Sequence, residues 1–371
     1  MRRRLGFLAA GIAAFLLSLA LSRVPGVAEA LYGEWVAPGV AWVLSRITGP
    51  LPFSLAEIVI VAFVSRQAVG AARGIVPAIR RRRRWRNALA AGALRLGQDA
   101  GIAVALLYLL WGFQYARPPV EARFGWPGGD DAPVEVIADL AEEMVVAAND
   151  AYVELHGAED AGEPTTIVDP AALDAALEKG WERVAATCGI RGPAAARFGR
   201  AKRLLISPIL DRLGLSGFFF PFTGEANVNA GVPAVSYPQV VAHEKSHQRG
   251  VGPENEANFF GFLAAALAPD ANARYSARVF AQRQLLTALL GAEPEKAREL
   301  IARRHPGVQR DVDDLRAYWE RHRGRAMDVT RAVNDAYLKT NRVEGGVLSY
   351  GRSVELFVAF ARQRRGRLTP D

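Results

Sequence analysis

Three long apolar runs lie within the first 116 residues, and they constrain the fold more than any other feature of the sequence. The first run, Leu5 to Ser22, contains 18 residues without a charge and has arginines on both sides. About 20 apolar residues in a helix are enough to cross a hydrocarbon core of roughly 30 Å. With the two later runs, the sequence predicts three transmembrane helices, at about residues 5–22, 51–72 and 100–116.

Two of these runs have a second interpretation. Ala28-Glu29-Ala30 resembles a signal-peptidase site, so a cleaved signal peptide is the alternative for the first run. A retained helix is favoured because the run is longer than the ~7–15 residues of a usual signal core. The second run is interrupted by Glu57, and an interfacial or re-entrant helix is the alternative there.

The basic excess of the chain belongs to the same third. Residues 1–116 contain 14 Arg and Lys against 4 Asp and Glu, whereas the other residues contain 32 against 34. Arginines fill positions 80–84, between the second and third runs, and short cytoplasmic loops are enriched in such residues. The pattern predicts a basic cytoplasmic loop at 73–97 and an extracytoplasmic C-terminal part. It disfavours nucleic-acid binding, which places the basic patch on the folded domain.

The rest of the chain has the pattern of one mostly helical domain. Prolines and glycines in 117–133 predict an extended linker, followed by a domain at 134–371. The aromatic residues, turn residues and valine of Gly217–Asn229 predict a short β-hairpin or edge strand. The expected fold class is therefore mainly α. Apolar residues recur at helical spacing in 134–156, 169–188, 271–290, 311–321 and 327–341.

The residues with the clearest chemical meaning form the HExxH pattern, His243-Glu-Lys-Ser-His247. Two histidines four residues apart lie on one face of a helix and can bind one zinc ion. Glu244 would lie beside the open coordination position, where a carboxylate can act as a general base. The alternative is two histidines on a solvated helix face without a metal.

A third ligand is expected from the next helix, which opens with Glu254-Asn-Glu-Ala-Asn258 after Pro253. Glu254 and Asn258 share a helix face, so Glu254 is favoured as the ligand and Asn258 as a hydrogen-bond partner of a ligand. Glu256 is the alternate ligand. Both glutamates could instead be first-turn charges that favour the helix dipole.

The block from His243 to Asn258 resembles the gluzincin metallopeptidases, in which a downstream glutamate completes HExxH. Over essentially its whole length, the chain more closely resembles the bacterial membrane family called domain of unknown function 3810. The resemblance implies a zincin-like domain that is anchored to the bacterial cytoplasmic (inner) membrane, with Zn²⁺ bound by His243, His247 and Glu254. Asn258 departs from the aspartate of several related peptidases. Further matching stretches are Pro221–Asn227, Asn334–Lys339 and Gly346–Tyr350.

Two other parts have expected roles. Gly217–Asn229 is the candidate edge along which a substrate backbone would bind; a core hairpin or an apolar lip on the bilayer are the alternatives. Tyr337 and Tyr350 are candidate catalytic residues because a tyrosine hydroxyl can stabilise an oxyanion, although helix packing explains each of them as well.

Together these features predict a membrane-anchored zinc metallopeptidase. It would hydrolyse peptide bonds with a zinc-activated water and Glu244 as general base. Its expected partners are the lipid bilayer and a peptide or protein substrate on the extracytoplasmic side. The alternative is a membrane-anchored sensor or scaffold with a structural or vestigial zinc site, in which a fourth side chain closes the metal.

Overall fold

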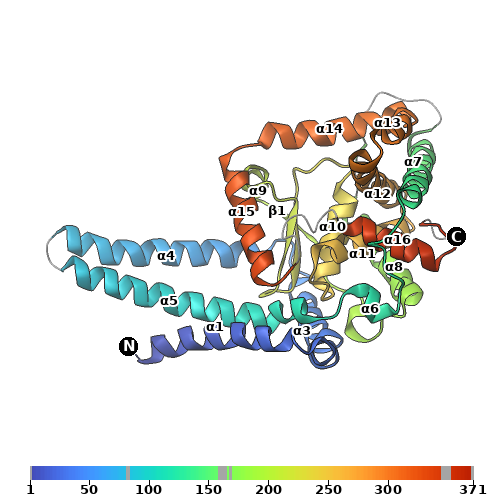
Figure 1. Ribbon diagram of the computed structural model, residues 1–371. Coiled ribbons are helices and arrows are strands. Elements are labelled where there is room, and N and C mark those ends of the chain that lie inside the picture. The colour runs from blue at the N-terminus through green and yellow to red at the C-terminus, as the bar shows by residue number, and fades with distance from the viewer. Residues whose placement is uncertain (1, 81–83, 158–164, 167–168, 344–351, 369–371) are drawn as a thin grey trace.

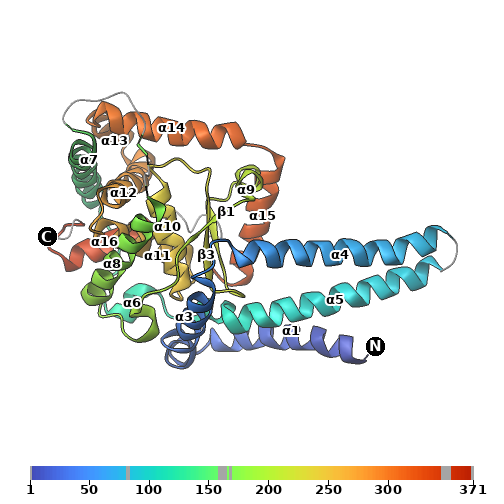
Figure 2. The same cartoon turned by 180° about the vertical axis from the view of Figure 1, so that it is seen from behind.

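The structure is a computed structural model that describes residues 2–80, 84–157, 165–166, 169–343 and 352–368. It is mainly helical, and long helices project from one side of a globular part (Figures 1 and 2). Three of these helices are long and apolar enough to cross a membrane, as the sequence predicts. They are α1 (Arg2–Leu21), α4 (Leu55–Ile79) and α5 (Trp85–Leu110).

Helices α4 and α5 are longer than the apolar runs that predict them. Most of the expected basic loop at 73–97 is helical, because α4 continues to Ile79 and α5 starts at Trp85. This expectation was wrong because arginine and alanine, which dominate the segment, are strong helix formers. One ion pair joins the two helices, with Arg66 Nη2 3.0 Å from Asp99 Oδ1.

The segment between α1 and α4 packs against the globular part. It contains α2 (Pro25–Ala28), η1 (Glu29–Gly33) and α3 (Val36–Thr48). The N-terminus of α4 is built on strand β3 (Glu225–Asn229), because the carboxylate of Glu225 accepts hydrogen bonds from the amides of Leu55 and Ala56, at 3.1 and 2.8 Å. The expected extended linker at 117–133 also contains a helix, α6 (Val120–Phe124).

The predicted helices of the globular part are present. Asp169 caps α8, since its carboxylate accepts hydrogen bonds from the amides of Ala171 and Ala172. The helix predicted at 311–321 begins earlier, at Pro306, where His305 supplies the cap. The helices are α7 (Val134–His156), α8 (Pro170–Cys188), η3 (Gly192–Ala195), α9 (Ser207–Leu213), α10 (Tyr237–Gln248), α11 (Glu254–Ala266), α12 (Ala271–Ala292), α13 (Pro294–Ala302), α14 (Pro306–His322), α15 (Arg325–Thr340) and α16 (Ser353–Gln363), after the short η2 (Gly112–Ala116) at the end of α5.

A small sheet of strand order β1-β3-β2 lies beside α10. The predicted hairpin is confirmed, because β2 (Gly217–Phe220) pairs antiparallel with β3, with Gly217 opposite Val228. Strand β1 (Lys202–Leu204) pairs parallel with β3 and was not predicted, because three residues carry no clear period. Strand β2 therefore lies at one edge of this sheet.

The core surrounds α11, which contacts α8, α10, α12 and α16. Phe259, Phe260 and Phe262 are fully buried on this helix. Gly261 lets α11 lie directly against the motif helix, because a Cβ there would be 2.9 Å from the backbone nitrogen of His243. This close approach fixes the start of α11 relative to the histidines of α10.

Candidate metal centre

The HExxH residues lie on α10, a mostly buried helix with Pro238 in its first turn. His243 and His247 are one turn apart, and their Nε2 atoms are 3.1 Å from each other. The ring of His247 is oriented by its Nδ1, which donates to the backbone carbonyl of Val251 at 2.7 Å. Its Nε2 is therefore the atom that faces the candidate site.

Glu254, the first residue of α11, completes a cluster with the two histidines. Its Oε2 lies 3.2 Å from His243 Nε2 and 3.4 Å from His247 Nε2. One donor atom from each of the three residues lies within 4.8 Å of the others. Two imidazole nitrogens and one carboxylate oxygen form a donor set that suits Zn²⁺. No fourth His, Cys, Asp or Glu joins them within the described residues.

The electrostatics of this cluster favour a cation. Burial alone would raise the pKa of Glu254, but the charges and hydrogen bonds of His247 and His243 lower it well below its usual range. Burial would lower the pKa of His247, yet the carboxylates of Glu254 and Glu244 raise it to about 9. The carboxylate of Glu254 is thus held ionised beside nitrogen atoms that attract a proton or a metal ion.

Glu244 lies next to this cluster, and the nearby histidines only partly offset the cost of burying its negative charge. Burial raises the pKa of Glu244 to about 7, and the nearby histidines lower it only in part. Its Oε2 is buried and has no hydrogen-bond partner among the described residues. Strand β2 passes directly over this carboxyl group, because a Cβ on Gly217 would be 2.7 Å from Glu244 Oε1. An unpaired buried carboxyl of this kind is typical of a general base.

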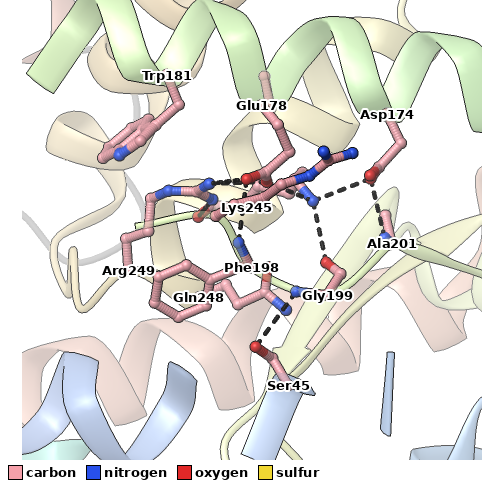
Figure 3. A network of polar contacts seen from close by, with 12 residues as sticks. Ser45, Asp174, Glu178, Trp181, Phe198, Gly199, Ala201, Lys245, Gln248 and Arg249 are labelled. Atoms are coloured by element: carbon pink, nitrogen blue, oxygen red, sulfur yellow. Dashed lines mark hydrogen bonds and ion pairs between the residues drawn. The ribbon is translucent and has the colours of Figure 1, made fainter. Parts of the chain in front are cut away.

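The opposite face of α10 is fixed by a buried network of charges (Figure 3). Glu178 of α8 lies 2.7 Å from Arg249 Nη2 and 2.8 Å from Lys245 Nζ. Asp174, one turn earlier, pairs with Lys245 at 3.0 Å. The guanidinium of Arg249 also lies against the ring of Trp181. Because Lys245 and Arg249 point away from the histidines, this network orients the motif helix without entering the site.

The rim of the site is built partly by the end of α5. The Trp111 ring lies edge-on to His247, with centroids 5.5 Å apart, and 5.0 Å from the ring of Phe219 on β2. Arg117 donates to the carbonyl of Gly250 at 2.9 Å. Sequence reasoning missed these residues. Aromatic residues at the end of an apolar run are usually explained by the membrane interface. That explanation gave no reason to expect Trp111 beside the candidate metal ligands.

The tyrosine predictions have different outcomes. The ring of Tyr337 on α15 contacts the ring of Tyr115, and their centroids are 5.9 Å apart. Besides burial, the negative charge of Glu254 contributes to the raised pKa of both tyrosines. Burial raises the pKa of Tyr337 to about 12, so its hydroxyl keeps its proton at neutral pH. Tyr350 lies outside the described residues. Tyr115 was not predicted, and its ring centroid lies 6.5 Å from that of Trp111.

The other two predicted residues of α11 are Glu256 and Asn258. Glu256 is buried and forms an ion pair with Arg123, and its carboxylate also accepts the amide of Val120 at 3.2 Å. This geometry favours Glu254 over Glu256 as the third ligand. Asn258 is buried one turn after Glu254, and its backbone carbonyl accepts a hydrogen bond from the side chain of Gln239 at 3.3 Å. For His247, the carbonyl of Val251 occupies the orienting role that was expected of Asn258.

Comparisons with known proteins give one match. Residues 32–358 match a family that is described as protein of unknown function (DUF3810). A search of the curated proteins gives no match. A search of the solved structures gives none either. The matched residues include the candidate metal centre, the sheet and two of the long apolar helices, so the chain belongs to the DUF3810 family of proteins of unknown function.

Proposed function

We propose that the protein is a membrane-anchored zinc metallopeptidase, with His243, His247 and Glu254 as metal ligands. The observation that carries this proposal is the convergence of these three side chains beside the buried carboxyl group of Glu244, whose Oε2 has no hydrogen-bond partner among the described residues. A structural zinc site closes its fourth position with a side chain and has no use for a free base. The described residues offer three ligands and a base, which is the composition of a catalytic site.

In the proposed reaction, the metal ligands and Glu244 have different roles. A bound Zn²⁺ would supply Lewis-acid chemistry, which polarises the scissile carbonyl and acidifies the attacking water. Glu244 takes a proton from that water at Oε2 and then donates it to the leaving amine nitrogen. Burial raises the pKa of Glu244 above its ordinary value, which makes its carboxylate a stronger base for this proton.

The edge strand β2 supplies the binding surface for a peptide. It pairs on one side with β3, and in the described sheet no strand covers its other side. A substrate in extended form would add to this free edge through backbone hydrogen bonds, which hold a peptide with little dependence on its sequence. Gly217 would bring that peptide directly over Glu244, because no side chain separates the strand from the carboxyl group.

The membrane placement of this site is part of the proposal. The start of α1, the end of α4 and the start of α5 lie at the same end of the long helices, and the globular part lies at the other end (Figure 1). Among the described residues, Arg2 to Arg4 begin α1, Arg80 follows α4 and Arg84 precedes α5. Positive residues favour the cytoplasmic side. We therefore propose that the metal centre lies on the extracytoplasmic face of the cytoplasmic membrane.

The test uses the full-length protein in lipid nanodiscs, with zinc content and cleavage of a mixed peptide library as the two readouts. We expect one zinc per chain in the parent and in Glu244→Gln, with cleavage only in the parent. Zinc in both with cleavage in neither would instead support a sensor or scaffold with a structural site. Absence of zinc from both proteins would refute the assignment of His243 and His247.

A further inference from the structure

An apolar cleft lies where α4 leaves the globular part, on the other face of β2 from the metal centre. Its volume is about 540 Å³, within the range of roughly 300–1,000 Å³ that is usual for ligand pockets. Ser65 is the one polar residue among the described residues that line it. Its walls come from a long apolar helix, a surface helix and the edge strand, with Val61 and Val64 of α4, Ile209 and Leu213 of α9, and Phe218 and Phe220 of β2.

The cleft is continuous with the surface that α4 would present to lipid. Val64 is 59% exposed and Val61 is 55% exposed, although both line the cleft. Helices α9 and α15 lie on the side of the globular part from which α4 projects (Figures 1 and 2). Val329 and Val333 of α15 are 63% and 65% exposed, and Leu205, which lies two residues before α9, is 87% exposed. An occupant of the cleft would therefore enter from the hydrocarbon region.

Strand β2 connects the cleft with the candidate general base. Successive side chains of a strand point to opposite faces. Phe218 and Phe220 line the cleft, whereas Phe219 contacts Trp111 on the metal side and Gly217 lies against Glu244. At about 3.3 Å per residue, the whole of β2 is only about 10 Å long. A molecule in the cleft and a peptide on the strand edge are thus within a few residues of each other.

We propose that the cleft holds a long acyl chain carried by the substrate, so that the protein cleaves lipid-modified peptides. This inference rests on the proposed peptidase function and names the substrate class of the same site. An apolar helix is a poor occupant, because a helix about 10 Å wide fills roughly 420 Å³ in each turn. The cleft would hold little more than one such turn, whereas an extended hydrocarbon chain can lie along it. The bond over Glu244 would then lie within about three residues of the acylated residue.

The first experiment compares two peptides of the same sequence, one palmitoylated and one acetylated at its first residue. The full-length protein in nanodiscs should cleave the palmitoylated peptide with a kcat/KM at least about 100-fold higher, since several methylene groups are buried. Val64→Trp and Leu213→Trp fill the cleft and should remove this preference while cleavage of the acetylated peptide continues. Val59→Trp is the matched control, because Val59 is also exposed on α4 but does not line the cleft.

A binding experiment separates this inference from the proposed peptidase function. A palmitoyl peptide with a photoreactive group on its chain should label α4 or α9 in the Glu244→Gln protein, and Val64→Trp should abolish the label. Such labelling, together with no hydrolysis of either peptide by the parent protein, would support the acyl site and contradict the peptidase. Equal cleavage of both peptides, with labelling elsewhere, would overturn the acyl site and leave the peptidase standing. Labelling by a photoreactive phospholipid that the acyl peptide does not displace would also overturn it, since the occupant would then be bilayer lipid.

Discussion

Replacing Glu178 with glutamine tests how the motif helix is held in place. Glu178 is 2% exposed and accepts hydrogen bonds from Arg249 and from the amide of Phe198. It also pairs with Lys245 at 2.8 Å. The substitution keeps the size of the side chain but leaves two buried cations with Asp174 as their only nearby anion in the network. Arg249 cannot turn to water, because its guanidinium lies between the rings of Trp181 and Phe198.

The expected loss of stability follows from two separate arguments. Breaking a buried ion pair by removal of one partner costs about 3–5 kcal/mol. Burial would raise the pKa of Glu178, but Arg249 and Lys245 outweigh it and lower the pKa from 4.5 to about 2. That difference corresponds to about 3 kcal/mol of stabilisation at neutral pH. For a domain of this size, about 3–5 kcal/mol lowers Tm by roughly 6–20 °C.

The assay is thermal unfolding of the full-length protein in detergent, followed by tryptophan fluorescence in the presence of a chelator. Glu182→Gln is the matched control, because Glu182 is exposed on the same helix and its loss should change stability by less than about 0.5 kcal/mol. In the double variant with Arg249→Met, the total loss should be smaller than the sum of the two single losses, because the two side chains form one pair.

The dependence on pH gives an independent check. The pKa of Glu178 is lower in the folded protein, so its stabilisation is present above pH 4.5 and disappears as the pH falls towards 2. The difference in Tm between parent and Glu178→Gln should therefore shrink over that interval. A loss below about 1 kcal/mol at pH 7, or a difference that persists at pH 2, would refute the reasoning.

Three further predictions concern the metal centre. Glu254→Gln should abolish zinc binding, whereas Glu256→Gln should keep one zinc per chain and only lower Tm; the reverse result would make Glu256 the ligand. Zinc at 100-fold excess over Kd should stabilise the protein by about 2.7 kcal/mol, and this shift should be absent in His247→Ala, as differential scanning fluorimetry would show. Gly217→Val would force a side chain to within 2.7 Å of Glu244 Oε1, so kcat should fall at least about 100-fold with zinc content unchanged, and retained activity would argue against the position of the strand.

Local patterns in the sequence were sufficient for much of the fold. Helix α7 has the bounds that its apolar period predicts, and α8 begins at the predicted cap, Asp169. The hairpin of β2 and β3 follows from its turn residues and aromatic side chains. These features depend on residues that are close in the chain, so the sequence displays them directly. The extension of α4 and α5 beyond the apolar runs was missed. Hydropathy indicates which residues can lie in a lipid bilayer, but it does not indicate where a helix ends.

For the candidate site, the sequence determined the chemical groups. The spacing of His243 and His247 places two nitrogen donors on one helix face whatever surrounds that helix. It could not decide between Glu254 and Glu256, since both lie in the first turn of α11. Tertiary structure separates the two side chains, because the packing of Gly261 against α10 brings Glu254 to the histidines, whereas Glu256 pairs with Arg123.

The surroundings of the site were decided by tertiary structure alone. Trp111, Glu178 and Gly217 lie in three separate parts of the sequence, yet each meets the motif helix from a different direction. No local sequence pattern predicts these contacts, because they depend on how whole helices and strands pack. The sequence by itself determined a region of long apolar helices and an HExxH motif on one helix. The packing of α5, α8 and β2 around α10 determined that Glu244 is buried with its Oε2 unpaired among the described residues, and that the edge strand of the described sheet lies beside it. These properties depend on how separate elements pack, so no local pattern in the sequence displays them.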